Sequence, residues 1–343
     1  MRSNLNPLLV DSYDYELPQE LIASSPANPK DSAKLLVYNR EDKSLTHTIF
    51  RDILTHIPKN SSIILNDTKV IKARLFGHKE SGAKIELLIN SPLEDNSFLV
   101  YIRGKVKKDT KLIFTQELTA SILKINEDGT RVVKFYQKDS EIDFEQLNDI
   151  LELIGHIPLP PYIKREDNKE DIKNYQTLFA KNIGAVAAPT ASLHFTPELL
   201  TKMQEQYDSA FITLHVGAGT FKPVEHQNIN NHIMHKEFYN IPKDTQKILD
   251  SNKSILAVGT TVTRTIEYYQ RIKKISGKSN LFLHPKNLPQ RVNHLLTNFH
   301  LPKSTLLMLV ASFVGVEEAL FLYREAIKKK YRFYSYGDAM LIL

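Results

Sequence analysis

The sequence predicts an α/β protein in which a small β-barrel domain is inserted into a larger, discontinuous α/β domain. Two observations support this prediction. Strand-like and helix-like segments alternate in residues 1–68 and 141–343, as they do in α/β domains. In residues 69–140, short runs of alternating apolar and polar residues follow one another without a helix. We therefore expect the barrel at 69–140 and the larger domain in the two flanking segments.

The predicted barrel rests on five strand-like runs. Each run alternates apolar and polar side chains with the period of two that a half-buried strand requires. Turn-forming residues separate the runs, among them Gly82, Pro92 and Gly129. A series of strands without helices closes most simply into a small barrel. The runs are AKIELLI, SFLVYIR, TKLIFT, TASILKI and RVVKFYQ.

The flanking segments supply the helices and strands of the larger domain. Apolar residues at helical spacing predict helices over residues 142–154, 197–206, 261–272 and 316–330. Continuous apolar runs predict buried strands at residues 211–216 and 254–258. The polar stretch 165–173 shows neither period, so we expect an exposed loop there.

Composition excludes several kinds of chemistry. The 343 residues include no cysteine, which excludes disulfides, thiolate metal sites, iron–sulfur clusters and cysteine nucleophiles within this chain. A net charge of +6 predicts a mild attraction to polyanions but does not prove RNA binding. The amino terminus has no sustained apolar run, and the longest apolar run, residues 306–316, is too short to span a bilayer. We therefore expect a cytoplasmic protein with no membrane partner.

Two blocks between residues 184 and 224 combine small residues with histidine and threonine. This mixture lets a ligand approach the backbone while polar groups stay within reach, although a tight turn between packed elements is the alternative. GAVAAPTASLHFT contains Thr190 and His194, whereas TLHVGAGTFKPV continues a buried strand into a glycine loop. Ligands in open α/β sheets collect at such carboxyl ends. The second block adds the candidates His215, Gly217, Gly219 and Thr220.

A third block, AVGTTVTRTIE, places a helix start directly after a strand. Gly259 ends the strand, Thr260 or Thr261 caps the helix, and Arg264 lies in its first turn. The free N–H groups of a helix start, together with an arginine, hold a carboxylate or phosphate. The alternative is an ordinary capped helix with a solvated arginine.

Residues 226–237 contain further titratable groups. His232 and His235 are three residues apart, but no helical pattern and no third ligand accompany them, so we expect no metal site. His235 and Glu237 alternate like neighbours on one strand face, which favours an acid–base pair. A surface histidine and a solvated carboxylate are the alternative.

The last block, YRFYSYGDAMLIL, contributes an aromatic group. If residues 331–338 are extended, Tyr334, Tyr336 and Asp338 share one strand face. Tyrosine rings stack on a base or lie against a sulfonium cation, and Asp338 would balance that positive charge. Aromatic residues of a strand also commonly belong to the core.

These blocks, with LNDTKVIKARLFG, LPPYI and TNFHLPKSTLLMLVASF, resemble the S-adenosylmethionine:tRNA ribosyltransferase-isomerase family of queuosine biosynthesis. The resemblance extends from residue 14 to the last residue, and it adds Asn298 and His300 to the candidate substrate-binding residues. It implies that the ribosyl part of S-adenosylmethionine, a cosubstrate, is isomerised onto 7-aminomethyl-7-deazaguanine at the tRNA wobble position. Adenine and methionine leave, and the product is epoxyqueuosine-tRNA.

The implied reaction needs a base, because the sulfonium acidifies the adjacent 5′ carbon. The candidate bases are His215, His235, Glu237 and Asp338, and the sequence does not choose among them. No metal is required, since the substrate itself carries the positive charge. We also expect a monomer without a permanently bound cofactor.

Two other classes of protein share some of these features. A methyltransferase would place a glycine-rich loop after its first strand, where this chain has Asn66 and Asp67. A noncatalytic RNA-binding module would not need the polar blocks of the larger domain.

The densest positive stretch, RGKVKKDTK, lies in the predicted barrel. Arg103, Lys105, Lys107 and Lys108 are candidate contacts for tRNA phosphates. A hairpin edge that lysines protect from aggregation accounts for the run equally well.

Overall fold

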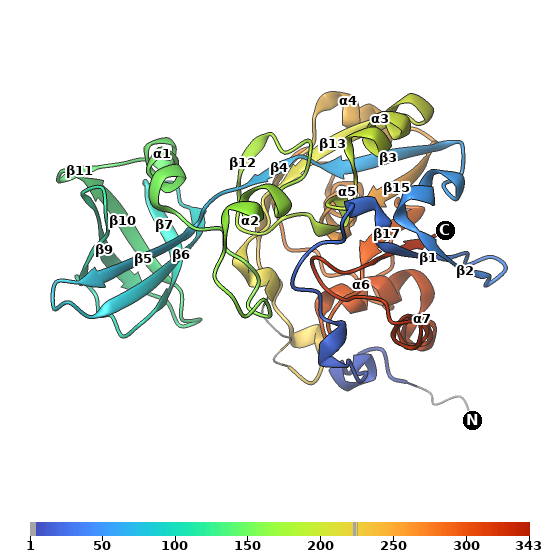
Figure 1. The fold of residues 1–343 in the computed structure, drawn as a ribbon, viewed down its shortest axis with the longest axis horizontal. Helices are drawn as coiled ribbons and strands as arrows, with labels where there is room; N and C mark the ends of the chain where they lie inside the picture. The colour runs from blue at the N-terminus through green and yellow to red at the C-terminus, as the bar shows by residue number, and fades with distance from the viewer. Residues whose placement is uncertain (1–4, 222–223, 225) are drawn as a thin grey trace. The chain divides into compact units, whose positions relative to one another are not determined.

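The computed structural model describes residues 5–221, 224 and 226–343 (Figure 1). The described residues form two compact units. The first lies in Met1–Thr68, Gln176–Asn182 and Pro189–Leu343, and the second consists of Lys69–Tyr175 and Ile183–Ala188. The second unit extends past residue 140 because it includes the two helices that follow the barrel. That residues 69–140 by themselves form the barrel domain stays a prediction.

A nine-stranded sheet forms the centre of the first unit. Its four middle strands, β13, β3, β15 and β17, are parallel. Toward both edges the neighbouring strands pair antiparallel, except for β18 and β1, which are parallel to each other. In spatial order the strands are β16 (Ser276–Ser279), β14 (Glu237–Asn240), β13 (Ser209–Leu214), β3 (Ser61–Asn66), β15 (Ser254–Val258), β17 (His294–Asn298), β18 (Ala339–Ile342), β1 (Lys34–Tyr38) and β2 (Leu45–Ile49).

Burial explains why β3 occupies the middle of this sheet. All six of its residues are buried, as expected for a parallel strand that is covered on both faces. Its neighbours are fixed in register, since Ile64 lies opposite Ala210 of β13 and Ala257 of β15. The carboxyl ends of the parallel strands therefore meet at one edge of the sheet.

Helices cover the sheet of the first unit. Leu199 and Met203 of α3 pack into a core with Leu65 and Leu256 from two parallel strands. The α-helices of this unit are α3 (Pro197–Gln206), α4 (Lys243–Leu249), α5 (Thr260–Ile272), α6 (Thr305–Val314) and α7 (Val316–Lys328). Short 3-10 helices lie at Val10–Tyr13, Gln19–Leu21, Lys30–Ser32, Phe50–Thr55, Thr190–Ser192, Ala218–Phe221 and Ile229–Asn231.

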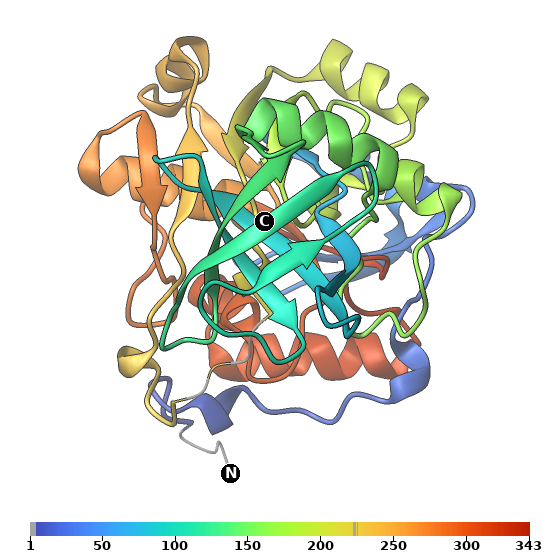
Figure 2. The ribbon, with the colours of Figure 1, turned by 90° about the vertical axis from the view of Figure 1, so that its left-hand side faces the viewer.

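The second unit contains a closed six-stranded barrel. Around the barrel the order is β10 (Arg131–Gln137), β7 (Ser97–Arg103), β6 (Lys84–Pro92), β5 (Arg74–Lys79), β8 (Lys111–Ile113) and β9 (Leu118–Ile125). The barrel closes because β9 also pairs with β10, and Figure 2 shows its strands from another side. Alternate residues such as Leu87, Val100 and Phe135 fill the interior. The predicted fold class, an α/β domain with an inserted barrel, is confirmed.

The remaining elements of the second unit correct one expectation. They are β11 (Ser140–Glu141), α1 (Phe144–Ile154) and α2 (Lys169–Asn174). A separate two-stranded sheet consists of β4 (Thr68–Val70) and β12 (Asn182–Ala185), whose first residues belong to the first unit. The predicted exposed loop at 165–173 is confirmed for residues 165–168 but wrong from Lys169, where α2 begins, and at the buried Asp171. Asn168 and Asp171 form a capping box that starts α2, and buried Asp171 also pairs with Arg165 at 2.6 Å.

None of the helices in the described residues combines the length and the apolar character that crossing a membrane requires. The helices α6 and α7, which are bent relative to each other, reach the necessary length and apolar composition only when they are taken together. Most residues of α6 are buried in the protein.

Candidate functional site

The parallel strands bring several predicted site residues to one edge of the sheet. β3 ends at Asn66, β13 at Leu214, β15 at Val258 and β17 at Asn298. His215 and Gly259 directly follow two of these strands. This edge is where open α/β sheets bind their ligands.

Asn66 joins three elements at this edge. Its side-chain oxygen accepts hydrogen bonds from the backbone N–H groups of Leu214, at 3.0 Å, and Thr68, at 3.2 Å. Its amide nitrogen donates to the carbonyl of Leu214 at 3.0 Å and to the hydroxyl of Thr261, in the first turn of α5, at 3.4 Å. The fully buried amide therefore fixes the end of β13 relative to the start of α5.

Asp67 makes a second set of buried contacts beside it. One carboxylate oxygen accepts from the Thr213 hydroxyl at 2.6 Å, and the other accepts from the Asn182 amide at 2.9 Å. These contacts orient the segment that follows β3, including Thr68. Both Asn66 and Asp67 belong to the positions where a methyltransferase would have a glycine-rich loop.

His215 is held by its neighbours but remains half-buried. Its Nδ1 lies 2.8 Å from the hydroxyl of Thr68, and its ring stacks on Phe238 with centroids 5.8 Å apart. Burial lowers the pKa of His215 below the ordinary imidazole value of 6.5, and the nearby charge of Asp67 opposes that shift. The ring is therefore neutral at pH 7 and able to accept a proton.

Glu237 and Arg264 form a buried ion pair. Their side chains are 6% and 5% exposed. The other oxygen of Glu237 accepts the backbone N–H of Gly217 at 3.1 Å, so the pair also holds the glycine loop after β13. Arg264 is therefore not a solvated arginine. Its Nε is buried and has no hydrogen-bond partner among the described residues.

The start of α5 leaves backbone donors available beside this pair. Gly259 adopts a φ of +98°, a conformation that favours glycine, and no side chain caps the helix. The expected cap by Thr260 or Thr261 is thus absent: Thr261 accepts from Asn66 instead. A helix start with uncapped N–H groups attracts an anion.

His235 lies against the glycine loop and is more exposed than Glu237. It precedes β14, its side chain is exposed, and a Cβ on Gly219 would come within 2.3 Å of its ring. Glu237 is buried, so the two side chains do not share an environment. The side chain of Thr220 lies outside the described part of the chain.

A second cluster surrounds Asn298 at the end of β17. Its amide lies 3.3 Å from Nε2 of His194 and donates to the carbonyl of Tyr334 at 3.2 Å, while its oxygen accepts from Thr190 at 3.4 Å. Burial lowers the pKa of His194 to about 3, and the charges of Arg332 and Lys30 act in the same direction. His194 is therefore a neutral hydrogen-bonding group.

His300 is neutral for the same reason. Its Nε2 lies 2.8 Å from the hydroxyl of Thr297, and its backbone N–H donates to Tyr323 at 3.1 Å. Burial lowers the pKa of His300 to about 3. Its environment fits a positioning role better than proton transfer.

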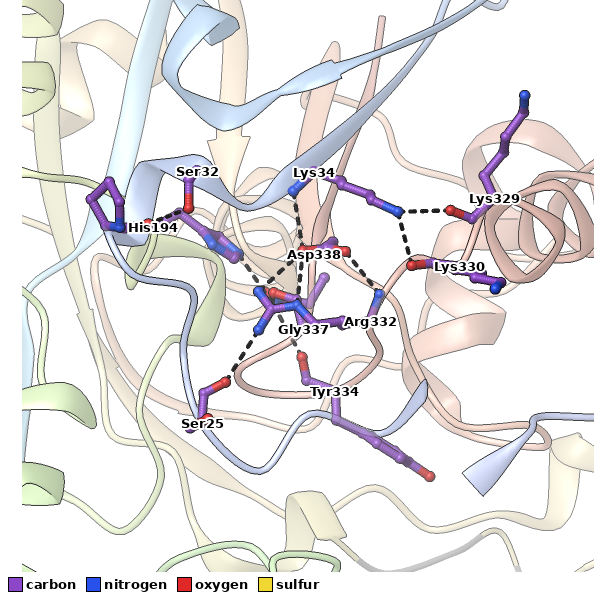
Figure 3. A network of polar contacts seen from close by, with 12 residues as sticks. Ser25, Ser32, Lys34, His194, Lys329, Lys330, Arg332, Tyr334, Gly337 and Asp338 are labelled. Atoms are coloured by element: carbon purple, nitrogen blue, oxygen red, sulfur yellow. Dashed lines mark hydrogen bonds and ion pairs between the residues drawn. The ribbon is translucent and has the colours of Figure 1, made fainter. Parts of the chain in front are cut away.

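The segment 331–338 is not extended, which corrects the expectation of a single strand face. β18 begins only at Ala339. Tyr334 has a φ of +72°, and a Cβ on Gly337 would approach the carbonyl oxygen of Arg332 to 2.5 Å, so the chain turns tightly here. Tyr336 is 1% exposed and belongs to the core, whereas the side chain of Tyr334 points away from the polar network (Figure 3).

Asp338 stands at the centre of that network (Figure 3). Its carboxylate accepts from the backbone N–H groups of Arg332, at 2.8 Å, and Lys34, at 3.1 Å. It also pairs with the guanidinium of Arg332 at 3.2 Å. A 1%-exposed carboxylate with this many donors holds the turn together and is poorly placed to remove a proton.

The chain is similar over its whole length to known proteins. The model of the queuosine biosynthesis protein family matches residues 10–342. The chain belongs to this family. The resemblance seen in the sequence is thus confirmed.

Relatives in this family carry one name. The S-adenosylmethionine:tRNA ribosyltransferase-isomerase of a Nitratiruptor species is 61% identical over 339 residues, which are 99% of this chain and 100% of that protein. The protein of the same name from Sulfurimonas denitrificans is 62% identical over 337 residues, or 98% of each chain. The crystal structure of the S-adenosylmethionine tRNA ribosyltransferase of Thermotoga maritima is 37% identical, with a TM-score of 0.55, and covers 97% of this chain and 100% of that one.

Within this family member, sequence reasoning missed three polar residues: Asn66, Asp67 and Thr68. A signal for them existed, because NDT directly follows the apolar run SSIIL. Polar residues after a fully buried central strand lie at the ligand-binding edge. In the part of the chain that the structure describes, no three His, Cys, Asp or Glu side chains are placed to hold a metal ion.

The basic run lies between two strands of the barrel. Arg103 ends β7 with a side chain that is 88% exposed and lies 4.0 Å from Glu86. Lys105, Lys107 and Lys108 follow in the exposed connection to β8. These side chains are accessible to a large anionic partner.

Proposed function

We propose that this protein is an S-adenosylmethionine:tRNA ribosyltransferase-isomerase. It transfers the ribosyl moiety of S-adenosylmethionine onto 7-aminomethyl-7-deazaguanine at the wobble position of tRNA, isomerises it, and releases adenine and methionine. The name shared by relatives that match the full chain supports this activity. The geometry that supports it best is a half-buried, neutral His215 at the ligand-binding edge of the sheet.

His215 is the base that the environment favours. The sulfonium acidifies the 5′ carbon of the substrate, and a base that takes this proton leaves an ylide. Loss of adenine then needs a proton donor, and the aminomethyl nitrogen of the RNA base must be oriented for attack. Of the other three candidates, Glu237 and Asp338 are buried and ion-paired, and His235 is exposed.

The start of α5 is the proposed site for an anionic group of the cosubstrate. Its uncapped N–H groups supply donors, and the Arg264–Glu237 pair fixes the adjoining glycine loop at Gly217. Thr260, Thr261 and Gly219 line the approach in this proposal. His194, Asn298 and His300 would orient polar groups of the substrate without titrating.

The barrel binds tRNA through Arg103, Lys105, Lys107 and Lys108, and residues 69–140 form its domain. The enzyme acts in the cytoplasm, where its RNA substrate is, as a monomer without a permanently bound cofactor. A methyltransferase is disfavoured, because Asn66 and Asp67 make buried contacts where a glycine-rich loop would approach the cosubstrate.

Product analysis tests the activity. The purified protein is incubated with S-adenosylmethionine and tRNA that carries the aminomethyl-deazaguanine, with a chelator present. Adenine and methionine should appear in equal amounts, and tRNA with guanine at the wobble position should give neither. Formation of S-adenosylhomocysteine would identify a methyltransferase, and persistence of both substrates would contradict the proposal.

A further inference from the structure

The barrel has a hollow that is lined by positive side chains. Its volume is about 570 Å³, and it is lined by Lys79, Gly104, Lys105, Val106, Lys107, Thr110 and Arg131. Four of these seven residues are cationic and none is acidic. In the part of the chain that the structure describes, none of the four cations forms an ion pair.

The alternation of β5 and β10 explains how the hollow arises. Leu75 in β5 and Val133 and Phe135 in β10 are buried in the barrel. Residues two apart on a strand share a face, so Lys79 and Arg131 continue the inward-facing rows at the ends of their strands. The interior is therefore apolar along its length and cationic at one mouth.

Hydrogen bonds shape this mouth. The ammonium of Lys79 donates to the carbonyl of Lys105 at 3.0 Å, and the backbone N–H of Lys107 donates to the hydroxyl of Thr110 at 3.0 Å. The guanidinium of Arg131 donates to the carbonyl of Gly129. Its Nε is buried and has no hydrogen-bond partner among the described residues. Cations that are held in place lose less conformational entropy when an anion binds.

We propose that this barrel mouth, defined by Lys79, Lys105, Lys107 and Arg131, binds consecutive phosphates of the RNA backbone. A hollow of this volume exceeds what one phosphate needs and lies in the range of sites for larger ligands, which often lie in barrel mouths. Four cations without a lining carboxylate favour a polyanion over a zwitterionic ligand. This inference rests on the proposed function, because the RNA is the tRNA substrate. It adds Lys79 and Arg131 to the RNA contacts, although neither lies in the basic run.

The test measures the affinity of an unmodified tRNA transcript between about 50 and 200 mM salt. The variant Lys79→Gln/Arg131→Gln should lower the affinity and flatten the plot of log K against log salt by about two units, one for each lost contact. Lys79→Arg/Arg131→Lys keeps both charges and should keep the slope of the parent protein. Melting temperatures show whether each variant is folded.

Two controls make the test decisive. Lys202→Gln/Lys278→Gln removes two exposed lysines of the other unit and should leave the slope near that of the parent. Lys79→Gln alone leaves the contact of Arg131 with Gly129 intact and should flatten the slope by about one unit. A parental slope in both glutamine variants, or an equal loss in the lysine control, would overturn the proposal.

Two further measurements distinguish an RNA site from a site for acidic proteins, and RNA binding from catalysis. In the first, polyglutamate competes with tRNA at equal charge concentration. If polyglutamate displaces tRNA from the parent protein but not from the double variant, the mouth binds acidic proteins and the RNA assignment is overturned. Adenine release by the parent protein is scored independently. A parent that binds tRNA through this mouth but releases no adenine would contradict the proposed reaction and leave the phosphate site standing.

Discussion

At the scale of single residues, burial separates the histidines by function. His194 and His300 are buried, and burial lowers the pKa of each to about 3, so both stay neutral across the physiological range. His215 is less buried, and its pKa is lowered against the opposing effect of Asp67. Only an imidazole whose pKa lies within reach of neutral pH exchanges protons efficiently there. This difference in burial supports the proposal that the first two position the substrate and that His215 transfers the proton.

Thr68→Val tests this assignment through the partner of His215. The substitution removes the hydroxyl 2.8 Å from Nδ1, so the ring loses the contact that fixes its orientation. We expect kcat to fall and the KM for tRNA to stay close to the parental value. Because burial lowers the pKa of His215 below 6.5, we expect the acidic limb of the parental pH profile below that pH, and we expect it to move in the variant. Steady-state adenine release from about pH 5.5 to 8 measures both effects.

Thr68→Ser is the matched control, because it restores the hydroxyl and should restore the pH profile. His215→Asn should lower kcat by about 10² to 10⁴-fold, the usual contribution of a general base. If Thr68→Val and its parent show the same profile, the hydrogen bond does not serve catalysis.

The residues of the candidate site were only partly predictable from sequence. His215 and the glycine loop stand out because a buried strand ends in small residues. The pairing of Arg264 with Glu237 was not predictable, because these residues are 27 positions apart and meet only when β14 lies beside β13. Asp338 illustrates the opposite error: an acid beside a glycine looked reactive, yet it holds a turn.

At the scale of elements, local signals predicted regular structure well. The helix expected at 197–206 has those limits, and the strand expected at 254–258 is β15. The prediction of an extended strand at residues 331–338 was wrong, because alternating side chains also occur in tightly turned chains. Tertiary contacts decide the outcome there, since Asp338 binds backbone N–H groups of both Arg332 and Lys34. Such contacts leave no periodic trace in the sequence.

Gly219→Ala tests the glycine loop as an element. A Cβ at this position would lie 2.3 Å from Cδ2 of His235, so the ring or the loop must move. His235 is exposed, so we expect the contact to be relieved at the surface and the melting temperature to change little. Turnover should nevertheless fall, because the same loop is tied to Glu237 through Gly217. Adenine release and thermal melting, measured together, separate the two effects.

Gly82→Ala is a useful comparison, because nothing lies within 4 Å of a Cβ at this position. Gly82 has a φ of +80°, so the substitution lowers stability through backbone strain alone. It should lower the melting temperature without lowering turnover at a permissive temperature. If Gly219→Ala behaves in the same way, the loop has no catalytic role.

At the scale of the whole molecule, the neutral histidines of the core make stability depend on pH. In the unfolded chain His194 and His300 bind protons below about pH 6.5, whereas in the folded protein they resist protonation down to about pH 3. The unfolded state therefore binds more protons in this window, and stability rises with pH. Their stabilisation is fully present above pH 6.5 and is lost as the pH falls.

The free energy of unfolding should accordingly fall below about pH 6.5, by about 1.4 kcal/mol per pH unit for each of the two histidines at most. Urea denaturation between about pH 7.5 and 5 measures this slope in a range where exposed carboxylates stay ionised. His300→Gln removes one such group and should lower the slope by up to about 1.4 kcal/mol per pH unit, while His194 and His294, whose pKa values burial also lowers, continue to contribute. The variant is less stable at neutral pH because it loses packing and its contact with Thr297. His78→Gln, at an exposed position of β5, should leave the slope unchanged. A stability that does not vary across this pH range would show that the core admits water to these imidazoles, and it would remove the basis for treating them as neutral groups in the site.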